Sequence, residues 1–106
     1  MAREKFQTLT EQMFYILLCL RNECCGADIM ERVRQVTRDR VIIGPGTLYS
    51  LLESFEREGF IRQTKVEGRK RSYVITADGS RRLEREVERL RRQVEDYAYF
   101  GEGAFA

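Results

Sequence analysis

The chain has 106 residues, of which 42% are hydrophobic and 34% are charged, and it contains no histidine. This size and balance fit one folded domain, with enough apolar material to offset chain entropy, while the missing histidine removes the commonest general base and metal ligand. A net charge of +2 is too small for bulk charge to identify a nucleic-acid partner, so the distribution of charge must decide that question. We expect no catalytic residue, metal or cofactor.

The three cysteines, Cys19, Cys24 and Cys25, have no C-x-x-C spacing, and their odd number does not suggest a disulfide framework. Cys19 is expected in the core, and Cys24 and Cys25 are expected to be reduced thiols in a turn at residues 22–26. The alternative, a redox or soft-metal site, has no accompanying ligand cluster. The apolar run at residues 13–20 is far shorter than the ~20 residues that span a bilayer, and no secretory signal is present, so we expect a cytoplasmic protein with no membrane partner.

A first helix is expected to begin at Thr10, whose side chain can cap it, with Glu11 in its first turn. Residues 13–20 read MFYILLCL, and a helix that is apolar on all sides must be covered on more than one face. The chain's own core can cover one face, so a second subunit is expected on the other; the alternative is a helix wrapped by its own domain. The interface residues expected here are Met13, Phe14 and Leu17. Residues 1–8, with the single aromatic Phe6, are expected to be frayed.

A second helix is predicted at residues 27–38 because apolar residues recur there at helical spacing. Its inward face is predicted to carry Ile29, Met30, Val33 and Val36. Residues 37–40 end this helix, and residues 41–43 are expected to return towards the core.

A third helix is predicted at residues 45–58, after the turn sequence Gly-Pro-Gly at 44–46, because proline is favoured in a first helical turn. Its buried face is predicted to carry Leu48, Leu51, Leu52 and Phe55. The opposite face carries Gly46, Ser50, Glu53 and Arg57, flanked by Thr47 and Tyr49. Small and hydroxylic side chains allow close approach to a major groove. A solvated face is the alternative, and Glu53 favours it mildly, since an acid near phosphate is repelled unless it binds a cytosine amine.

Two strands are predicted at residues 60–66 and 70–76, which are rich in β-branched and aromatic residues. Gly59 is expected to end the third helix in a left-handed conformation, and residues 67–69 form a tight turn around a glycine. A two-stranded ribbon is marginal by itself, so its base must be anchored on the helices. The anchors are expected to be Ile61, Tyr73 and Ile75.

The basic charge of the chain is concentrated in this hairpin. Residues 61–76 hold five basic side chains and one acid (5 − 1 = +4), so the other ninety residues sum to −2. The cations expected at the open end of the hairpin are Lys65, Arg69, Lys70 and Arg71. A DNA-contacting wing and a merely solubilising edge are both compatible with this pattern, and the neighbouring groove-sized helix favours the wing.

A last long helix is predicted to begin at Thr76, with Asp78 at the positive end of its dipole. Its apolar positions alternate at spacings of four and three, a heptad seam with valine at a and leucine at d that favours two-stranded pairing. They are Leu83, Val87, Leu90, Val94 and Tyr97. The same spacing would also serve a helix that packs on its own core. The tail at residues 98–106, with Tyr99, Phe100 and Phe105, is expected to be mobile.

These elements predict a mainly α protein with a small β-hairpin wing: a winged helix-turn-helix at residues 1–76 and a dimerisation helix and tail at 77–106. Three segments, GTLYSLLESFEREGFI (46–61), EGRKRSYVIT (67–76) and ADGSRRLE (77–84), resemble the PadR-type transcriptional regulators. The first segment is fairly specific, and the rest is common to many winged helices. The resemblance spans about residues 9–96, and the short chain is similar to the compact subgroup with a single C-terminal helix.

The resemblance implies a homodimer, in which the last helix contacts the partner's first helix, and operator DNA as the partner. The residues expected at DNA are Thr47, Tyr49, Ser50, Arg57, Lys65, Arg69, Lys70 and Arg71. Tyr49 is expected to contact a phosphate or brace the helix. The resemblance also implies a small aromatic or lipophilic effector near the dimer interface, with Met13, Phe14, Tyr97 and Phe100 as plausible walls. The function expected is a sequence-specific repressor; the alternative is a winged-helix module that binds protein and not DNA.

Overall fold

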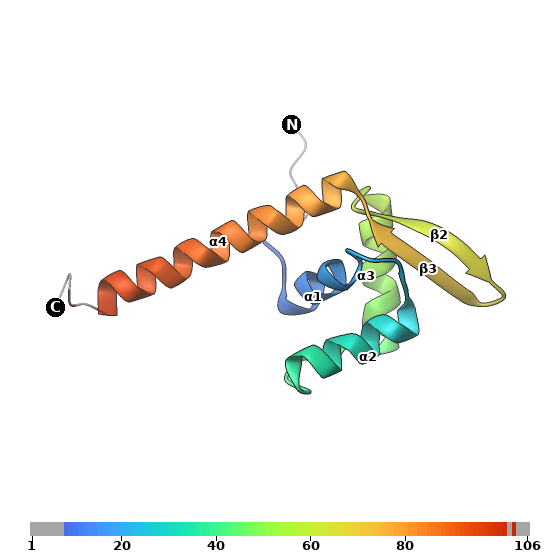
Figure 1. Cartoon of the computed structure of the whole chain (residues 1–106), viewed down its shortest axis with the longest axis horizontal. Coiled ribbons are helices and arrows are strands. Elements are labelled where there is room, and N and C mark those ends of the chain that lie inside the picture. The colour runs from blue at the N-terminus through green and yellow to red at the C-terminus, as the bar shows by residue number, and fades with distance from the viewer. Residues whose placement is uncertain (1–7, 102, 104–106) are drawn as a thin grey trace.

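The structure is a computed structural model that describes residues 8–101 and residue 103. The elements follow in the order α1 (Glu11–Cys19), β1 (Cys24–Cys25), α2 (Gly26–Thr37), α3 (Pro45–Arg57), β2 (Ile61–Glu67), β3 (Lys70–Ile75) and α4 (Ala77–Gly101). The β2–β3 hairpin and α4 leave the three-helix body in opposite directions (Figure 1), and the chain measures 60 × 40 × 22 Å. The expectations for Phe6 and Phe105 fall outside the described residues.

The core lies between the first three helices and is closed on one side by the sheet and the start of α4. It contains fully buried residues from α1 (Ile16, Leu17), α2 (Ile29, Val33) and α3 (Leu48, Leu52, Phe55), together with Leu20 and Ile61. Burying each of these side chains stabilises the fold by about 1.5–3 kcal/mol. Thr10 caps α1 as predicted, since its side chain accepts a hydrogen bond from the Met13 N–H at 3.2 Å. The other apolar residues of α1 are only half-buried.

One predicted core position on α2 is wrong. Val36 is 69% exposed, while Thr37 is buried in its place. The buried stripe runs through Ile29, Val33 and Thr37 at steps of four residues, which leaves Val36 to one side. The Thr37 hydroxyl donates to the Val33 carbonyl at 2.7 Å and accepts from the Val41 N–H at 3.1 Å. A hydroxyl can lie in the core here because its hydrogen bonds are made.

The sheet has three strands, in the order β1-β3-β2, and not the two predicted. Cys24 and Cys25, expected in a turn, pair with Tyr73 and Ser72 of β3 in antiparallel register. This short strand covers the edge of β3 that a two-stranded hairpin would leave open. Two buried cysteines suit this position because each is a small apolar side chain.

The hairpin of residues 61–75, called the wing below, has the predicted strands and turn. Ile61 pairs with Ile75 at the base and Glu67 with Lys70 at the tip, with a register shift between Gln63 and Lys65. Gly68 has a φ of +64°, which a tight turn requires and only glycine adopts without strain. The predicted anchors Ile61 and Tyr73 are buried, whereas Ile75 is half-buried.

Thr76 joins the end of α3, the base of the wing and the start of α4. Its hydroxyl accepts from the Gly79 N–H at 3.1 Å, as a helix cap does, and donates to the Gly59 carbonyl at 2.6 Å. Its N–H donates to the Phe60 carbonyl at 2.9 Å. Gly79 sits directly on this junction, where a Cβ would overlap the Phe60 carbonyl and stand 2.7 Å from Ile75 Cγ1. The start of α4 is therefore held tightly against the wing.

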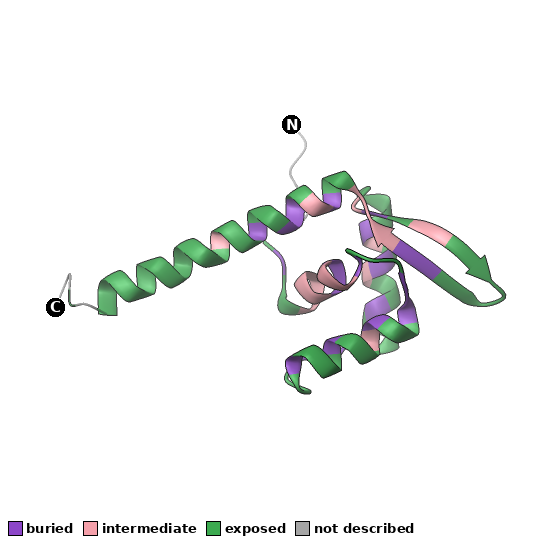
Figure 2. Cartoon of the chain, viewed as in Figure 1, coloured by how far each residue is buried: buried purple, intermediate pink, exposed green. Residues whose placement is uncertain are grey.

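Only the first part of α4 is buried. Leu83 belongs to the core, beside the buried pair Arg82 and Glu86, which are 2% and 1% exposed and whose charged groups lie 3.6 Å apart. Figure 2 shows the outer part of the helix as mostly exposed. The helix continues to Gly101, so the prediction that the tail becomes mobile at residue 98 is wrong for residues 98–101. No helix within residues 8–101 is long and apolar enough to cross a bilayer.

The Glu86 carboxylate is held between two arginines. It pairs with Arg82 and Arg89, and it accepts a hydrogen bond from the Arg89 side chain. Burial by itself would raise the pKa of this carboxyl. Hydrogen bonds from Arg89 and from the Leu9 backbone, with the two arginine charges, outweigh burial and hold the pKa below its ordinary value of 4.5. The charged Glu86 carboxylate thus links the backbone of Leu9, just before α1, to α4.

Candidate nucleic-acid interface

The third helix, α3, presents an exposed face of small and polar residues. Gly44 precedes it in an extended conformation and Pro45 occupies the first turn, as the sequence predicted. Leu48, Leu52 and Phe55 are buried, and Leu51 is half-buried. The opposite face is exposed and includes Gly46, Thr47, Ser50, Glu53 and Arg57. No heavy atom would lie within 4 Å of a Cβ at Gly46, so the start of the helix is open to close approach.

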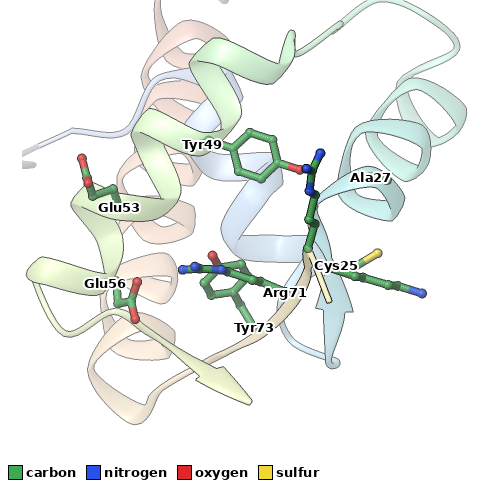
Figure 3. Close-up of a pocket in the computed structure, with 10 residues that line it drawn as sticks. Cys25, Ala27, Tyr49, Glu53, Glu56, Arg71 and Tyr73 are labelled. Atoms are coloured by element: carbon green, nitrogen blue, oxygen red, sulfur yellow. The ribbon is translucent and has the colours of Figure 1, made fainter. Parts of the chain in front are cut away.

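Tyr49 fixes the start of α3 against the start of α2. A Cβ on Gly26 would lie 2.7 Å from the Tyr49 hydroxyl oxygen and 2.9 Å from a ring carbon, so the ring lies on the glycine backbone. Figure 3 shows the Tyr49 side chain reaching from α3 towards Ala27. This contact gives Tyr49 the bracing role that was one of its two expected roles, while half of its surface remains exposed.

The four predicted cations of the wing, Lys65, Arg69, Lys70 and Arg71, are all exposed. Arg69 lies in the turn, and Lys70 and Arg71 begin β3. None of the four takes part in an ion pair within the part of the chain that the structure describes. Their charges are consequently available to an external anion.

A cleft of ≈ 630 Å³ separates α3 from the wing, and it is called the α3–wing cleft below. Its residues come from the start of α2, from α3 and from the wing: Cys25, Gly26, Ala27, Tyr49, Glu53, Glu56, Arg69, Lys70, Arg71 and Tyr73. The wall formed by α3 carries two acids, and the wall formed by the wing carries three cations. The Arg71 side chain lies beside the Tyr73 ring on the side that faces Glu56 (Figure 3).

The phenol of Tyr73 lies between the two walls of this cleft. Its pKa is raised, first by burial and then by the negative charge of Glu56, while the charge and hydrogen bond of Arg71 oppose the rise. The hydroxyl therefore stays protonated at neutral pH and can act as a hydrogen-bond donor.

The structure brings half of the predicted DNA-binding residues together. Tyr49, Arg69, Lys70 and Arg71 line the α3–wing cleft, whereas Thr47, Ser50, Arg57 and Lys65 are exposed but do not line it. Glu56 and the start of α2 also line the cleft and were not among the predicted site residues. Glu56 follows Tyr49 by seven residues and Glu53 by three, so its place on the cleft side of α3 was available from helical spacing. The start of α2 reaches the cleft through tertiary packing, which no local sequence pattern predicts.

The predicted dimer-interface residues divide into two groups. Leu17 and Leu83 lie in the chain's own core, so these two predictions need correction because neither offers surface to a second chain. Met13 and Phe14 are half-buried, and α4 exposes Val87, Leu90, Val94 and Tyr97, the last two at 67% and 81%. Of the suggested effector walls, Met13 and Phe14 lie on α1, whereas Tyr97 and Phe100 lie in the last turns of α4, far from α1 in Figure 1.

The three cysteine thiols are free, and Cys24 and Cys25 are buried. Burial raises the pKa of Cys24 to about 11, only partly opposed by the charge of Arg32. Such a thiol is a poor nucleophile and a poor metal ligand at neutral pH. Within the described residues, no group of three or more cysteine, aspartate or glutamate side chains could hold a metal ion. The alternative of a redox or soft-metal site therefore gains no support from the geometry.

Solved structures of similar fold include transcriptional regulators. One from Clostridium thermocellum is 23% identical with a TM-score of 0.71, and the alignment covers 85% of this chain and 91% of that one. A PadR family regulator from Eggerthella lenta is 24% identical with a TM-score of 0.68, covering 89% and 81%. Bacillus subtilis PadR in complex with operator DNA is 25% identical with a TM-score of 0.63, covering 71% of this chain but 45% of that one.

Among curated proteins, none matches the sequence. The sequence model of the family described as "Transcriptional regulator PadR-like family" matches residues 16–85, more than half of the chain. This stretch runs from α1 through the first turns of α4 and includes the α3–wing cleft. The resemblance that the motifs indicated is thereby confirmed, and the family consists of regulators and not of enzymes: the chain belongs to the PadR-like family of transcriptional regulators.

Proposed function

We propose that the chain is a sequence-specific DNA-binding repressor that acts as a homodimer in the cytoplasm. The observation that carries this proposal is the placement of three exposed wing cations, Arg69, Lys70 and Arg71, across one cleft from the exposed face of α3. A helix of this size fits a major groove, and cations on a neighbouring ribbon can neutralise phosphates. Bacillus subtilis PadR, a structural neighbour, has been solved with operator DNA, which supports the same use of the fold here.

A second chain is proposed to cover the apolar surface that one chain leaves exposed. The outer part of α4 presents a stripe of four residues at heptad spacing: Val87, Leu90, Val94 and Tyr97. In addition, α1 is half-buried along the face that carries Met13 and Phe14. Pairing the α4 stripe of one chain with α1 of the other would bury both surfaces. In this division residues 1–76 bind DNA and residues 77–106 form the dimer, although α4 is also fixed to the first unit through Leu83 and Glu86.

The mechanism follows from this arrangement. Two subunits place their α3 helices one DNA turn apart, ~34 Å, so that each enters a major groove. The wing cations neutralise phosphates and supply most of the affinity, while side chains of α3 choose the bases. A small aromatic or lipophilic effector at the dimer interface would release the operator if it bound one arrangement of the two subunits better than the other.

Titration of a fluorescently labelled random duplex at low salt tests the proposal. DNA binding that weakens steeply as salt rises supports it, because phosphate contacts release counterions. A second titration at fixed salt with DNA selected from a random pool measures sequence specificity. Failure to bind any duplex at low salt would exclude the regulator mechanism and favour a winged-helix module that binds protein.

A further inference from the structure

Glu53 stands out on the exposed face of α3 because its charge is opposite to the one that DNA attracts. It lies at a step of three residues from Ser50 and of seven from Gly46, so all three share one side of the helix. It also lines the α3–wing cleft, opposite the wing cations. Glu53 thus occupies the middle of the surface that the proposed function places against DNA.

No neighbouring side chain neutralises this carboxylate. Arg57 is one turn further along α3, at the spacing that favours an ion pair, yet its guanidinium donates to the Ser54 hydroxyl at 3.4 Å instead. Among the described residues, Glu53 takes part in no ion pair or side-chain hydrogen bond. The other acid of the cleft differs, since Glu56 lies close enough to Tyr73 to raise the pKa of that phenol.

An unpaired carboxylate facing DNA weakens binding through its repulsion by phosphates. The repulsion is offset where the carboxylate accepts a hydrogen bond from a base. In the major groove only two groups can donate one: the 4-amino group of cytosine and the 6-amino group of adenine. A guanine or thymine edge at the same place offers only acceptors, so the carboxylate would be desolvated without a partner.

We propose that Glu53 is a specificity-determining residue that accepts a hydrogen bond from an exocyclic amino group of cytosine or adenine in the major groove. The inference rests on the proposed function and deepens it, since it names a base contact of α3. It also gives the acid a dual role. Glu53 lowers the affinity for DNA in general and restores it only at sites with an amino group in the right place.

The test begins with selection of the DNA that the full chain binds from a random pool. Each cytosine of the selected site is then replaced by pyrimidin-2-one, which lacks the 4-amino group, and each adenine by purine, which lacks the 6-amino group. Affinities are measured for the wild type and for Glu53→Ala. At one position per half-site, the analogue should weaken wild-type binding roughly ten-fold and leave Glu53→Ala unchanged. The analogue that has this effect identifies the base.

Glu58→Ala is the matched control, because Glu58 is an exposed acid that caps the end of α3 outside the cleft lining. Both variants remove one negative charge and should bind random duplex somewhat more tightly than the wild type. Only Glu53→Ala should lose the preference at the position found with the analogues. If the wild type binds DNA and Glu53→Ala keeps every base preference, the inference is overturned while the proposed function stands. If the wild type binds no duplex, the proposed function itself fails.

Discussion

The ring of Tyr49 lies on the backbone of Gly26, with the Tyr49 hydroxyl oxygen 2.7 Å from where a Cβ of residue 26 would be. Gly26 is the first residue of α2, and Tyr49 is in the second turn of α3. The contact therefore holds the start of α3 against the start of α2. Any side chain at position 26 must displace the ring.

Gly26→Ala is expected to lower affinity for the selected DNA while changing the free energy of unfolding by less than about 1 kcal/mol. The new methyl group moves a half-exposed ring, and alanine is the better helix former, so the two effects on stability oppose each other. A double-mutant cycle with Tyr49→Ala checks the cause. The affinity loss in Gly26→Ala/Tyr49→Ala should equal that of Tyr49→Ala, and additive losses would show that Gly26 does not act through the ring.

Gly79→Ala is expected to destabilise the fold by about 3 kcal/mol, measured by urea unfolding. A Cβ at this position overlaps the Phe60 carbonyl, which is backbone and has little room to move. The comparison is Gly46→Ala, because a Cβ there meets no heavy atom within 4 Å. Since glycine is the poorer helix former, Gly46→Ala should stabilise by about 0.5 kcal/mol. Equal stabilities of the two variants would contradict the close approach of α4 to the wing.

Glu86→Gln is expected to destabilise the chain by about 1–3 kcal/mol at pH 7, because it removes a charged acceptor from the buried Arg82 and from Arg89. The pKa of Glu86 is lower in the folded chain than in the unfolded one. The contribution of the Glu86 charge to the free energy of unfolding is therefore fully present above the ordinary glutamate pKa of 4.5. It is lost as the pH falls through the lower pKa that Glu86 has in the folded chain. Urea unfolding at a series of pH values should show the two proteins converging in acid.

Glu88→Gln is the control for the buried carboxylate. Glu88 lies two residues further along α4 and also pairs with two arginines, Arg91 and Arg92, but all three side chains are exposed. Exposed pairs contribute little, so this variant should lie within about 0.5 kcal/mol of the wild type at every pH. A similar loss in both variants would mean that burial of Glu86 does not matter.

Replacing Arg69, Lys70 and Arg71 by alanine is expected to weaken binding to all duplexes alike. The logarithmic slope of affinity against salt should also fall, by roughly 0.9 for each phosphate that the wing no longer neutralises. Fluorescence titrations of selected and random DNA at several salt concentrations measure both quantities. Arg34, in the last turn of α2, and Arg38 and Arg40, just after this helix, are exposed, and Figure 1 shows this end of α2 far from the wing. Replacing these three arginines by alanine removes as much positive charge as the wing variant does. It should leave the slope of affinity against salt unchanged.

Leu90→Asp is expected to give monomers in sedimentation velocity, because the charge falls in the middle of the exposed α4 stripe. The fold should persist, since Leu90 is not part of the core of one chain. Arg92→Asp changes the charge of the same helix by a larger amount on the side opposite Leu90 and should remain dimeric. A Leu90→Asp protein that still sediments as a dimer would place the interface elsewhere.

Elements with local signals could be read from the sequence. Thr10 and Thr76 cap helices where their hydroxyls predicted it, and the glycines at 59 and 68 take the positive φ expected of them. These features depend on interactions within a few residues along the chain. The wing cations followed from the same local reasoning, because a turn between two β-branched segments places its own residues at the tip.

Features that depend on distant parts of the chain were missed. The strand at Cys24–Cys25 is too short to show any periodicity, and it exists because the edge of β3 is available to it. Leu83 fits the heptad of α4, yet the core reaches α4 at this point and buries it. Likewise, the side of α3 that helical spacing assigns to Glu56 becomes a wall of the cleft only because the wing folds back beside it. In each case the missing information was the position of a second element.

The hydroxyl of Thr76 makes the junction between the wing and α4 rigid. It bonds Gly59, just before the wing, to the first turn of α4, and α4 extends from there as a rod of 25 residues, about 37 Å at 1.5 Å per residue. A displacement of a few ångströms at the far end of this rod becomes a tilt of several degrees where the first part of α4, from Thr76 to Glu86, packs on the domain. In the proposed dimer, α4 would transmit such a tilt to the wing and α3, so contacts between the subunits would change the affinity for DNA.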